Sequence, residues 1–426
     1  MKIEELYKLF LSCTNACTDT RKLKKDNMYF ALKGDNFDGN DFATKASKLG
    51  AKYCVVDDKT LDDDSSFILV DDVLTALQQL ARYHRDQLTI PIIGLTGSNG
   101  KTTTKELINA VLSTKFKTKA TIGNLNNHIG VPLSVLSITE NDDIGIIEMG
   151  ANHQKEIEFL SAICQPDYGL ITNFGKAHLE GFGGVEGVIK GKSELYDYLK
   201  ANDKTAIINT DDQKQIEQIG NYKKVYTFGS SQDNDCTITF KKAIPYVTVD
   251  YLNTAISSNL VGDYNFSNIA VAIALGHNFE VSKDLIKNAI ESYTPNNNRS
   301  EILNKDSNLI LLDAYNANPT SMLAALKNFL HLEYDHKVLF LGDMFELGED
   351  AAEEHQSIVN YVEKHFKDRI FLVGENFYKT QCSDSTLKFQ YFESLKSKLT
   401  KGTFKNSAIL IKGSRGMALE RILEYI

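Results

Sequence analysis

Residues 92–104 contain the pattern in this chain that points most directly to chemistry. An apolar run over residues 92–95 leads into a glycine-rich turn and then into a segment that begins Lys101-Thr102-Thr103. Glycines in such a turn let backbone N–H groups close on phosphate oxygens, and the start of the following helix adds positive potential. A lysine here neutralises the outer phosphates, and a threonine hydroxyl can hold Mg²⁺. The segment therefore predicts a site for ATP or GTP.

This segment departs from the plain P-loop pattern at one position. The first glycine of that pattern would fall at Leu95, and the chain has Gly94 instead. The alternative interpretation is a glycine turn that joins a core strand to a helix and binds nothing. Gly-Lys-Thr in front of a helix with apolar residues at helical spacing favours nucleotide binding over that alternative.

Glu148 is the next candidate, because it ends the apolar run 144–147. A carboxylate that a strand delivers beside a P-loop is typical of a site for Mg²⁺ or for a bound water. A lone acidic residue after a strand is otherwise an ordinary loop residue. With the P-loop one strand earlier, we favour metal binding.

His178 and Lys192 follow the third strand of this region. His178 by itself is equally consistent with a hydrogen-bonded loop histidine. Lys192 lies on the apolar stripe of a helix, seven residues from both Val185 and Leu199. A lysine that faces a core must be neutral, paired or chemically changed. The alternative is a side chain that reaches solvent from the edge of the stripe.

Alternating strands and helices must position these residues. The pattern predicts an α/β protein with units over residues 1–87, 88–294 and 295–426, joined near residues 295–299 by a polar linker. We expect a helix over 73–84 and a mainly parallel central sheet. The expected strands are 28–32, 53–56, 92–95, 144–148, 168–172, 206–209, 309–312, 338–341, 370–373 and 408–411. Polar turns after the last strands would share one face of the third sheet.

Bulk properties exclude several classes of function. The net charge of −9 over 426 residues argues against non-specific binding to nucleic acid or to membrane surfaces. The six cysteines lack the spacing of zinc ligands. The N-terminal sequence is not that of a signal peptide, and no apolar run reaches the roughly 18 residues of a membrane span. We expect a monomeric, cytoplasmic protein that neither binds nucleic acid nor inserts into a membrane.

Together these segments resemble the Mur ligase family, the ATP-dependent amino-acid and peptide ligases of peptidoglycan synthesis. The resemblance extends from Thr18 to Arg415, and its most specific motifs lie at 148–153, 177–182, 315–319 and 341–348. It implies a small α/β N-terminal domain that binds the UDP-muramyl substrate, a central P-loop ATPase domain, and a Rossmann-like C-terminal domain that closes over ATP. The Asp-Asn-Pro-Arg motif of the diaminopimelate-adding branch is absent. The resemblance therefore favours ATP-dependent addition of D-alanyl-D-alanine to UDP-N-acetylmuramoyl-tripeptide.

The resemblance also implies roles for individual residues. Those that would contact ATP are Gly97, Ser98, Asn99, Gly100, Lys101, Thr102, Thr103, Asn268, Arg299 and Asp313. Those that would hold two Mg²⁺ ions are Thr102, Glu148, His178 and Lys192, the last as a carbamate. The substrate contacts would be Thr20, Arg21, Asn124, Asn126, Asn127 and Asn316. The residues expected to act in catalysis are Lys101, Lys192, His178 and Arg299.

Two departures from the family pattern bear on these roles. Tyr264 stands where the family often has histidine, and Leu312-Asp313 replaces a common Asp-Asp pair.

Two alternative functions are also compatible with a P-loop. One is a sibling enzyme, either another Mur ligase or a folylpolyglutamate synthase-like ligase. The other is a nucleotide-driven switch that forms no bond, although a switch would not need His178 and an inward Lys192.

Overall fold

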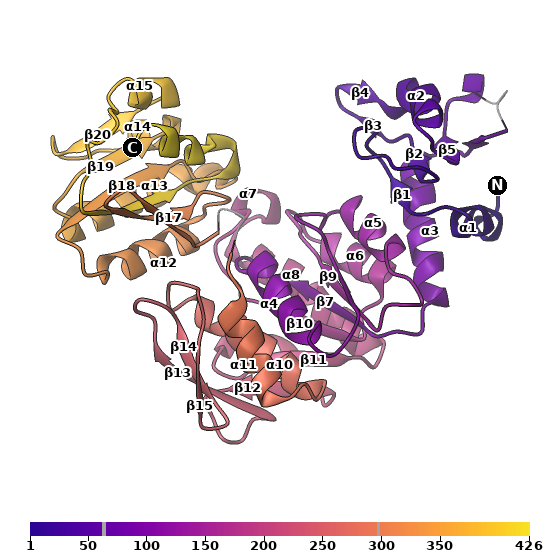
Figure 1. The fold of residues 1–426 in the computed structure, drawn as a ribbon, viewed down its shortest axis with the longest axis horizontal. Helices are drawn as coiled ribbons and strands as arrows, with labels where there is room; N and C mark the ends of the chain where they lie inside the picture. Colours follow the sequence, from indigo (N-terminus) through magenta and orange to yellow (C-terminus); the bar gives the residue numbers. More distant parts are fainter. Residues whose placement is uncertain (62–64, 296–298) are drawn as a thin grey trace.

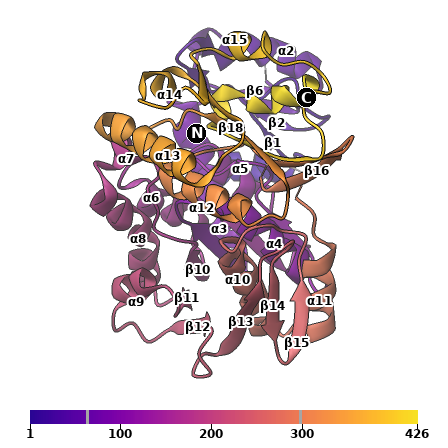
Figure 2. The ribbon, with the colours of Figure 1, turned by 90° about the vertical axis from the view of Figure 1, so that its left-hand side faces the viewer.

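A computed structural model describes residues 1–61, 65–295 and 299–426 of the chain. Three α/β units follow one another along the sequence, each built on its own sheet (Figures 1 and 2). The expected α/β class is therefore confirmed. Residues 296–298 of the expected linker lie outside the described residues.

The first unit has a four-stranded parallel sheet in the order β1-β2-β5-β6. Its strands and short hairpin are β1 (Ala16–Cys17), β2 (Met28–Phe30), β3 (Lys33–Gly34), β4 (Phe37–Asp38), β5 (Tyr53–Val56) and β6 (Phe67–Leu69). Its helices are α1 (Ile3–Leu11), α2 (Ala43–Lys48) and α3 (Val73–Gln87), with 3₁₀ turns at Gly39–Phe42 and Lys59–Leu61.

Helix α3 joins the first unit to the second. Its N-cap Asp72 accepts a hydrogen bond from the Thr75 N–H, which satisfies one of the free donors of the first turn. Leu77 and Leu80 are fully buried in the core that the two units share. At its C-terminal end, the buried His84 contacts the Ile138 carbonyl at 2.8 Å. The first sheet is thus held to the central unit by packing along a whole helix.

The central sheet has nine strands in the order β15-β14-β13-β12-β11-β10-β7-β9-β8. Its strands are β7 (Ile92–Thr96), β8 (Thr118–Ala120), β9 (Ile144–Glu148), β10 (Tyr168–Ile171), β11 (Thr205–Asn209), β12 (Val225–Gly229), β13 (Cys236–Lys242), β14 (Thr248–Tyr251) and β15 (Thr254–Ser257). Its helices are α4 (Lys101–Leu112), α5 (Gly130–Leu136), α6 (Glu156–Cys164), α7 (Leu179–Phe182), α8 (Val185–Ala201), α9 (Gln213–Ile219), α10 (Asn265–Asn278) and α11 (Lys283–Ser292). The expected parallel arrangement holds from β8 to β13, but β14 and β15 add an antiparallel edge that the sequence analysis missed.

Helices cover both faces of the central sheet, which explains why its strands read as continuous apolar runs. On β7, Ile92 packs into the core beneath α5, α6 and α8, whereas Ile93 and Leu95 pack beneath α4 and α10. The unusual Gly94 faces the first of these cores. A Cβ there would lie 2.8 Å from Pro166 and 3.0 Å from the Met149 methyl. Close packing against Pro166 and Met149 therefore explains why a glycine stands at position 94.

The third unit has a six-stranded sheet in the order β16-β17-β21-β18-β19-β20. All neighbours are parallel except the edge pair β16–β17. Its strands are β16 (Glu301–Lys305), β17 (Asn308–Asp313), β18 (His336–Gly342), β19 (Ile370–Val373), β20 (Thr386–Phe389) and β21 (Ser407–Lys412). Its helices are α12 (Pro319–Leu330), α13 (Ala351–His365), α14 (Glu375–Lys379) and α15 (Phe392–Lys396), with 3₁₀ turns at Gly348–Asp350, Arg415–Met417 and Leu419–Glu424.

The ten strands expected from sequence all exist, and those over 53–56, 144–148 and 370–373 have the expected bounds. The largest boundary differences are the end of α3, three residues later than expected, and the end of β2 and the start of β18, each two residues earlier. No helix in the described ranges is long and apolar enough to cross a membrane. All six cysteines lie in those ranges, and no disulfide bond joins any two of them there.

Packing along α3 predicts a large effect of truncation at one position. Leu77→Ala should lower the free energy of unfolding by about 2–5 kcal/mol, because it leaves a cavity in a core that two units share. Urea denaturation followed by circular dichroism measures the change. Gln79→Ala, on the exposed side of the same helix, should change it by less than about 0.5 kcal/mol. Equal effects of the two variants would contradict this packing.

Candidate functional site

A cavity of about 700 Å³ lies beyond the carboxyl ends of β7, β9 and β10, and loops of the third unit close its other side. Ligands bind in this position in open α/β sheets. The predicted residues that line it are Ser98, Asn99, Gly100, Lys101, Thr102, Thr103, Asn124, Asn126, Asn127, Glu148, His178, Asn268, Arg299, Asp313 and Asn316. The predicted residues that do not line it are Thr20, Arg21, Gly97 and Lys192.

The P-loop leaves the N-terminus of α4 open towards this cavity. Gly100, the N-cap residue, has φ +80° and provides no side-chain cap. A Cβ at Gly100 would lie 2.5 Å from the Asn268 amide oxygen, so only glycine fits between the loop and α10. The first N–H groups of α4 are therefore available to an anion.

Lys101, the first residue of α4, also lines the cavity. Its ammonium donates to the carbonyl oxygens of Gly97 at 2.6 Å and Ser98 at 3.3 Å. The pKa of Lys101 is lowered to about 8, mainly by burial; Glu148 opposes this shift, and the Arg299 charge adds to it. The ammonium of Lys101 is therefore already shielded from water in the absence of a ligand.

Glu148 has an arrangement suited to a metal ion. Its Oε1 accepts hydrogen bonds from Thr102 Oγ1 at 3.2 Å and Asn126 Nδ2 at 2.8 Å. Its buried Oε2 has no hydrogen-bond partner among the described residues, and the nearest ammonium, of Lys105, lies 4.0 Å away. A buried carboxylate oxygen without a donor is costly. Thr102 and Glu148 therefore fit a hard cation such as Mg²⁺.

Lys105 is a residue of the site that the sequence analysis missed. It is 3% exposed, and its ammonium donates to the Gly123 carbonyl at 3.2 Å. Burial lowers the pKa of Lys105, whereas Glu148 raises it. Its spacing of four residues from Lys101 was the available signal, because such residues share one face of a helix.

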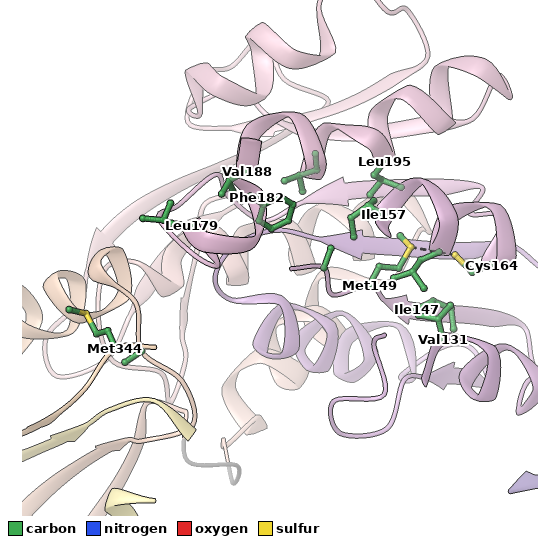
Figure 3. Close-up of a cluster of buried hydrophobic side chains, with 14 of the residues drawn as sticks. Val131, Ile147, Met149, Ile157, Cys164, Leu179, Phe182, Val188, Leu195 and Met344 are labelled. Atoms are coloured by element: carbon green, nitrogen blue, oxygen red, sulfur yellow. Dashed lines mark hydrogen bonds between the residues drawn. The ribbon is translucent and has the colours of Figure 1, made fainter. Parts of the chain in front are cut away.

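Lys192 is fully buried one layer behind the cavity, as the apolar stripe predicted. Its ammonium lies 4.8 Å from the centre of the Phe182 ring and donates to the Ala151 carbonyl at 3.0 Å. Figure 3 shows Phe182 among the apolar side chains of α7, α8 and β9. Burial lowers the pKa of Lys192 well below its ordinary value, and the Lys101 charge lowers it further. Both causes shift the equilibrium of Lys192 towards the neutral amine.

His178 is both a loop histidine with a hydrogen bond and a residue of the cavity wall. It has φ +55° and stands at the N-cap of α7. Its Nδ1 contacts Glu346 Oε2 of the third unit. Within the described residues, no cluster of three or more His, Cys, Asp or Glu side chains has the form of a metal site. A metal here would need further ligands from a modified lysine or from bound phosphates.

The far wall of the cavity comes from the domain junction. The Arg299 guanidinium lies 3.7 Å from the centre of the Tyr315 ring, and its Nε has no hydrogen-bond partner among the described residues. Asp313 forms an ion pair with the buried Lys412. Tyr264, at the position where histidine is common, shares a 2.8 Å hydrogen bond with Ser300. Tyr315 lies in the motif at 315–319 and Lys412 in the polar turn expected after the last strand, but the sequence analysis assigned no role to either residue.

The remaining predicted residues divide into two groups. Asn126 bonds to Glu148, and the Asn127 side chain accepts the N–H groups at the start of α5. Asn268 accepts from Thr104 Oγ1 at 3.0 Å, so it also supports the P-loop helix. Arg21, by contrast, has an 86% exposed side chain paired with Asp19 in the first unit.

Comparison with known proteins covers nearly the whole chain. The family model described as "Mur ligase family, catalytic domain" matches residues 13–85, "Mur ligase middle domain" matches 95–276, and "Mur ligase, glutamate ligase domain" matches 298–415. A protein of Bacillus subtilis (strain 168) named UDP-N-acetylmuramoyl-tripeptide–D-alanyl-D-alanine ligase is 35% identical over 425 residues. That alignment covers 96% of this chain and 92% of the relative.

Solved structures agree with the sequence comparison. A crystal structure of MurF from Acinetobacter baumannii matches with a TM-score of 0.85 and 28% identity, over 99% of this chain and 98% of that chain. The structure of MurF ligase from Thermotoga maritima in complex with ADP has a TM-score of 0.84 and 26% identity, over 98% of this chain and 97% of that chain.

The lowered pKa of Lys101 predicts a pH dependence of triphosphate binding. The pKa is about 8 in the free site, and a bound anion raises it. Binding above that pH therefore takes up a proton, and affinity should fall by up to about tenfold per pH unit as pH rises past 8. Calorimetry of ATP binding in buffers of different ionisation enthalpy measures the uptake. Lys101→Arg, which stays charged, should show none. A pH-independent affinity of the unaltered protein would contradict the shift.

Proposed function

Because this chain belongs to the Mur ligase family, we infer that it is the ATP-dependent ligase that joins D-alanyl-D-alanine to UDP-N-acetylmuramoyl-tripeptide. The products are UDP-N-acetylmuramoyl-pentapeptide, ADP and phosphate, so the enzyme forms a C–N bond in peptidoglycan precursor synthesis. The observation that carries this function is the cavity between P-loop and third unit, in a chain similar over nearly its full length to ligases of that name.

The reaction has two steps. A carboxylate oxygen of the tripeptide attacks the γ-phosphorus of ATP, the bond to ADP breaks, and an acyl phosphate forms. The amine nitrogen of D-alanyl-D-alanine then attacks the acyl carbon, phosphate leaves, and the nitrogen loses its extra protons to solvent. Both reactants of the first step are anions, and their repulsion at short range is on the order of several kcal/mol. Lys101 and Arg299 would screen that repulsion, while the N–H groups at the start of α4 hold the phosphates.

Two Mg²⁺ ions would complete the neutralisation. Thr102 and Glu148 would hold one, which agrees with the unpartnered Oε2 of Glu148. His178 and a carbamate on Lys192 would hold the other. Bound Mg²⁺ supplies charge neutralisation and polarisation of the phosphoryl group. The neutral Lys192 amine is the form that adds CO₂, with an N–C bond formed and one proton released, and its burial favours that form.

The three domains would divide the substrates among them. The domain over 1–87, with Thr20 and Arg21, would bind the UDP-muramyl portion together with Asn124, Asn126 and Asn127 of the central domain. The domain over 88–294 would bind ATP, with Asn268 near the base. The domain over 295–426 would close over ATP through Asp313 and bind the dipeptide near Asn316. We place the enzyme in the cytoplasm as a monomer, where ATP and nucleotide-linked precursors are available.

Phosphate release from ATP tests this function against its alternatives. Release should require UDP-muramyl tripeptide and D-alanyl-D-alanine together, because the acyl phosphate forms on one substrate and is consumed by the other. A sibling ligase would instead respond to a single amino acid such as glutamate, and a nucleotide switch would release phosphate with neither substrate. Either result, or no release with both substrates, would refute the proposal. Tripeptides that end in lysine and in diaminopimelate should be assayed side by side.

Carbamylation of Lys192 has its own test. Lys192→Ala should lower turnover by at least about 100-fold, because a metal ligand is lost. Lys190→Ala, on the exposed side of the same helix, should keep normal turnover. Removal of CO₂ should reduce the activity of the unaltered enzyme, and ¹³C-bicarbonate should restore it together with a carbamate NMR signal. Full activity of Lys192→Ala would refute the role.

A further inference from the structure

The loop after β18 sends two carboxylates in opposite directions. Asp343 is 3% exposed and accepts the N–H groups of Asn376 and Phe377, both at 2.9 Å, so it caps a helix of its own unit. Glu346, three residues later, leaves the third unit and contacts Nδ1 of His178 in the central unit. The assigned machinery of the reaction does not use this second carboxylate.

Backbone contacts hold Glu346 at that point. Its φ is +62°, a left-handed conformation that is uncommon for a residue with a side chain. Its carbonyl accepts the N–H of Glu180 in α7 at 3.3 Å. Gly348 packs against the same residue, since a Cβ there would lie 3.2 Å from the Glu180 Cβ. The loop is therefore docked on α7, and Glu346 faces His178 from a defined position.

The contact decides which imidazole nitrogen is free. An ionised carboxylate only accepts hydrogen bonds, so the Nδ1 that faces Glu346 carries the proton. In the neutral imidazole the other nitrogen, Nε2, then keeps its lone pair, in a residue that lines the cavity. Metal-bound histidines commonly have this arrangement, in which a carboxylate holds the tautomer and the ring orientation.

We propose that Glu346 is a positioning residue that sets His178 in the Nδ1–H tautomer and so prepares Nε2 to bind the second Mg²⁺. This inference rests on the proposed role of His178 as a metal ligand. Because Glu346 belongs to the third domain, that metal site is complete only when the third domain is docked on the central one. The enzyme thereby couples domain closure to metal binding through one hydrogen bond.

Docking of the two domains does not depend on Glu346. Lys176 pairs with Glu354 at 2.5 Å, and its N–H donates to Thr320 Oγ1 at 3.0 Å. The Asn318 amide donates to Asn99 Oδ1 of the P-loop at 2.7 Å. The Glu346 side chain is 52% exposed, and a polar contact this exposed adds little to association. Glu354 therefore provides a matched control, a carboxylate at the same junction that does not touch His178.

¹⁵N NMR of labelled histidine, in metal-free protein, tests the tautomer directly. The signal of His178, identified from its loss in His178→Ala, should show Nδ1–H in the unaltered enzyme. Glu346→Gln should keep this tautomer, because the amide oxygen still accepts a hydrogen bond. Glu346→Ala should lose it, whereas Glu354→Ala should not. An unchanged tautomer in Glu346→Ala would overturn the proposal.

Mn²⁺ titration followed by electron paramagnetic resonance tests the consequence. With a non-hydrolysable ATP analogue, UDP-muramyl tripeptide and bicarbonate present, Glu346→Ala should weaken the second Mn²⁺ by about 10–100-fold and leave the first unchanged. Glu346→Gln should lie close to the unaltered enzyme, and Glu354→Ala should match it.

The same titration distinguishes the positioning role of Glu346 from the metal-binding role of His178. If His178→Ala loses the second Mn²⁺ and Glu346→Ala does not, the positioning role is wrong while the metal role of His178 stands. If His178→Ala keeps both ions, the metal role is wrong and the positioning role falls with it. If Glu354→Ala weakens the second ion as much as Glu346→Ala, the effect is loss of docking, which also overturns the proposal. The ligase function is judged separately, by phosphate release.

Discussion

Crowding of basic side chains around one buried carboxylate is the constraint on which this structure depends. Glu148 raises the pKa of Lys101 and Lys105, the Arg299 charge lowers the pKa of both, and the Lys101 charge lowers the pKa of Lys192. In a chain with a net charge of −9 this is a local excess of desolvated cations. Such an arrangement costs free energy in the free protein and is relieved by anionic ligands. A site that brings a carboxylate to a triphosphate requires this preparation.

One segment, residues 172–180, connects the parts of the site. Thr172 Oγ1 donates to the Asn99 carbonyl at 2.6 Å, and the Asn173 amide oxygen accepts the Asn99 N–H at 3.1 Å. The same segment carries Lys176 and His178, which contact the third domain. The same short segment therefore contacts both the P-loop and the third domain. Movement of the third domain would therefore displace residues that contact the P-loop, because these contacts are short and directional.

Much of the architecture was predictable because local sequence patterns determine most of the strands and helices. Buried parallel strands are continuous apolar runs, so the ten expected strands all exist. The sequence analysis missed the edge hairpin of β14 and β15, because two short strands with mixed exposure resemble a polar loop. Lys105 was overlooked although its spacing from Lys101 was visible. Lys412 and Tyr315 lie in recognised segments, but their roles could not be assigned, since their contacts with Asp313 and Arg299 form only when the third unit is assembled.

The sequence by itself determined the features that depend on neighbours along the chain. The glycine turn before Lys101, the carboxylate that ends β9 and the inward direction of Lys192 all follow from spacing within one strand, turn or helix. Tertiary structure decided which charges meet. His178 and Glu346 are 168 residues apart and belong to different domains, and the free oxygen of Glu148 is apparent only once the surrounding donors are in place. Such pairings depend on how separately folded units pack against one another, and no local pattern encodes that packing.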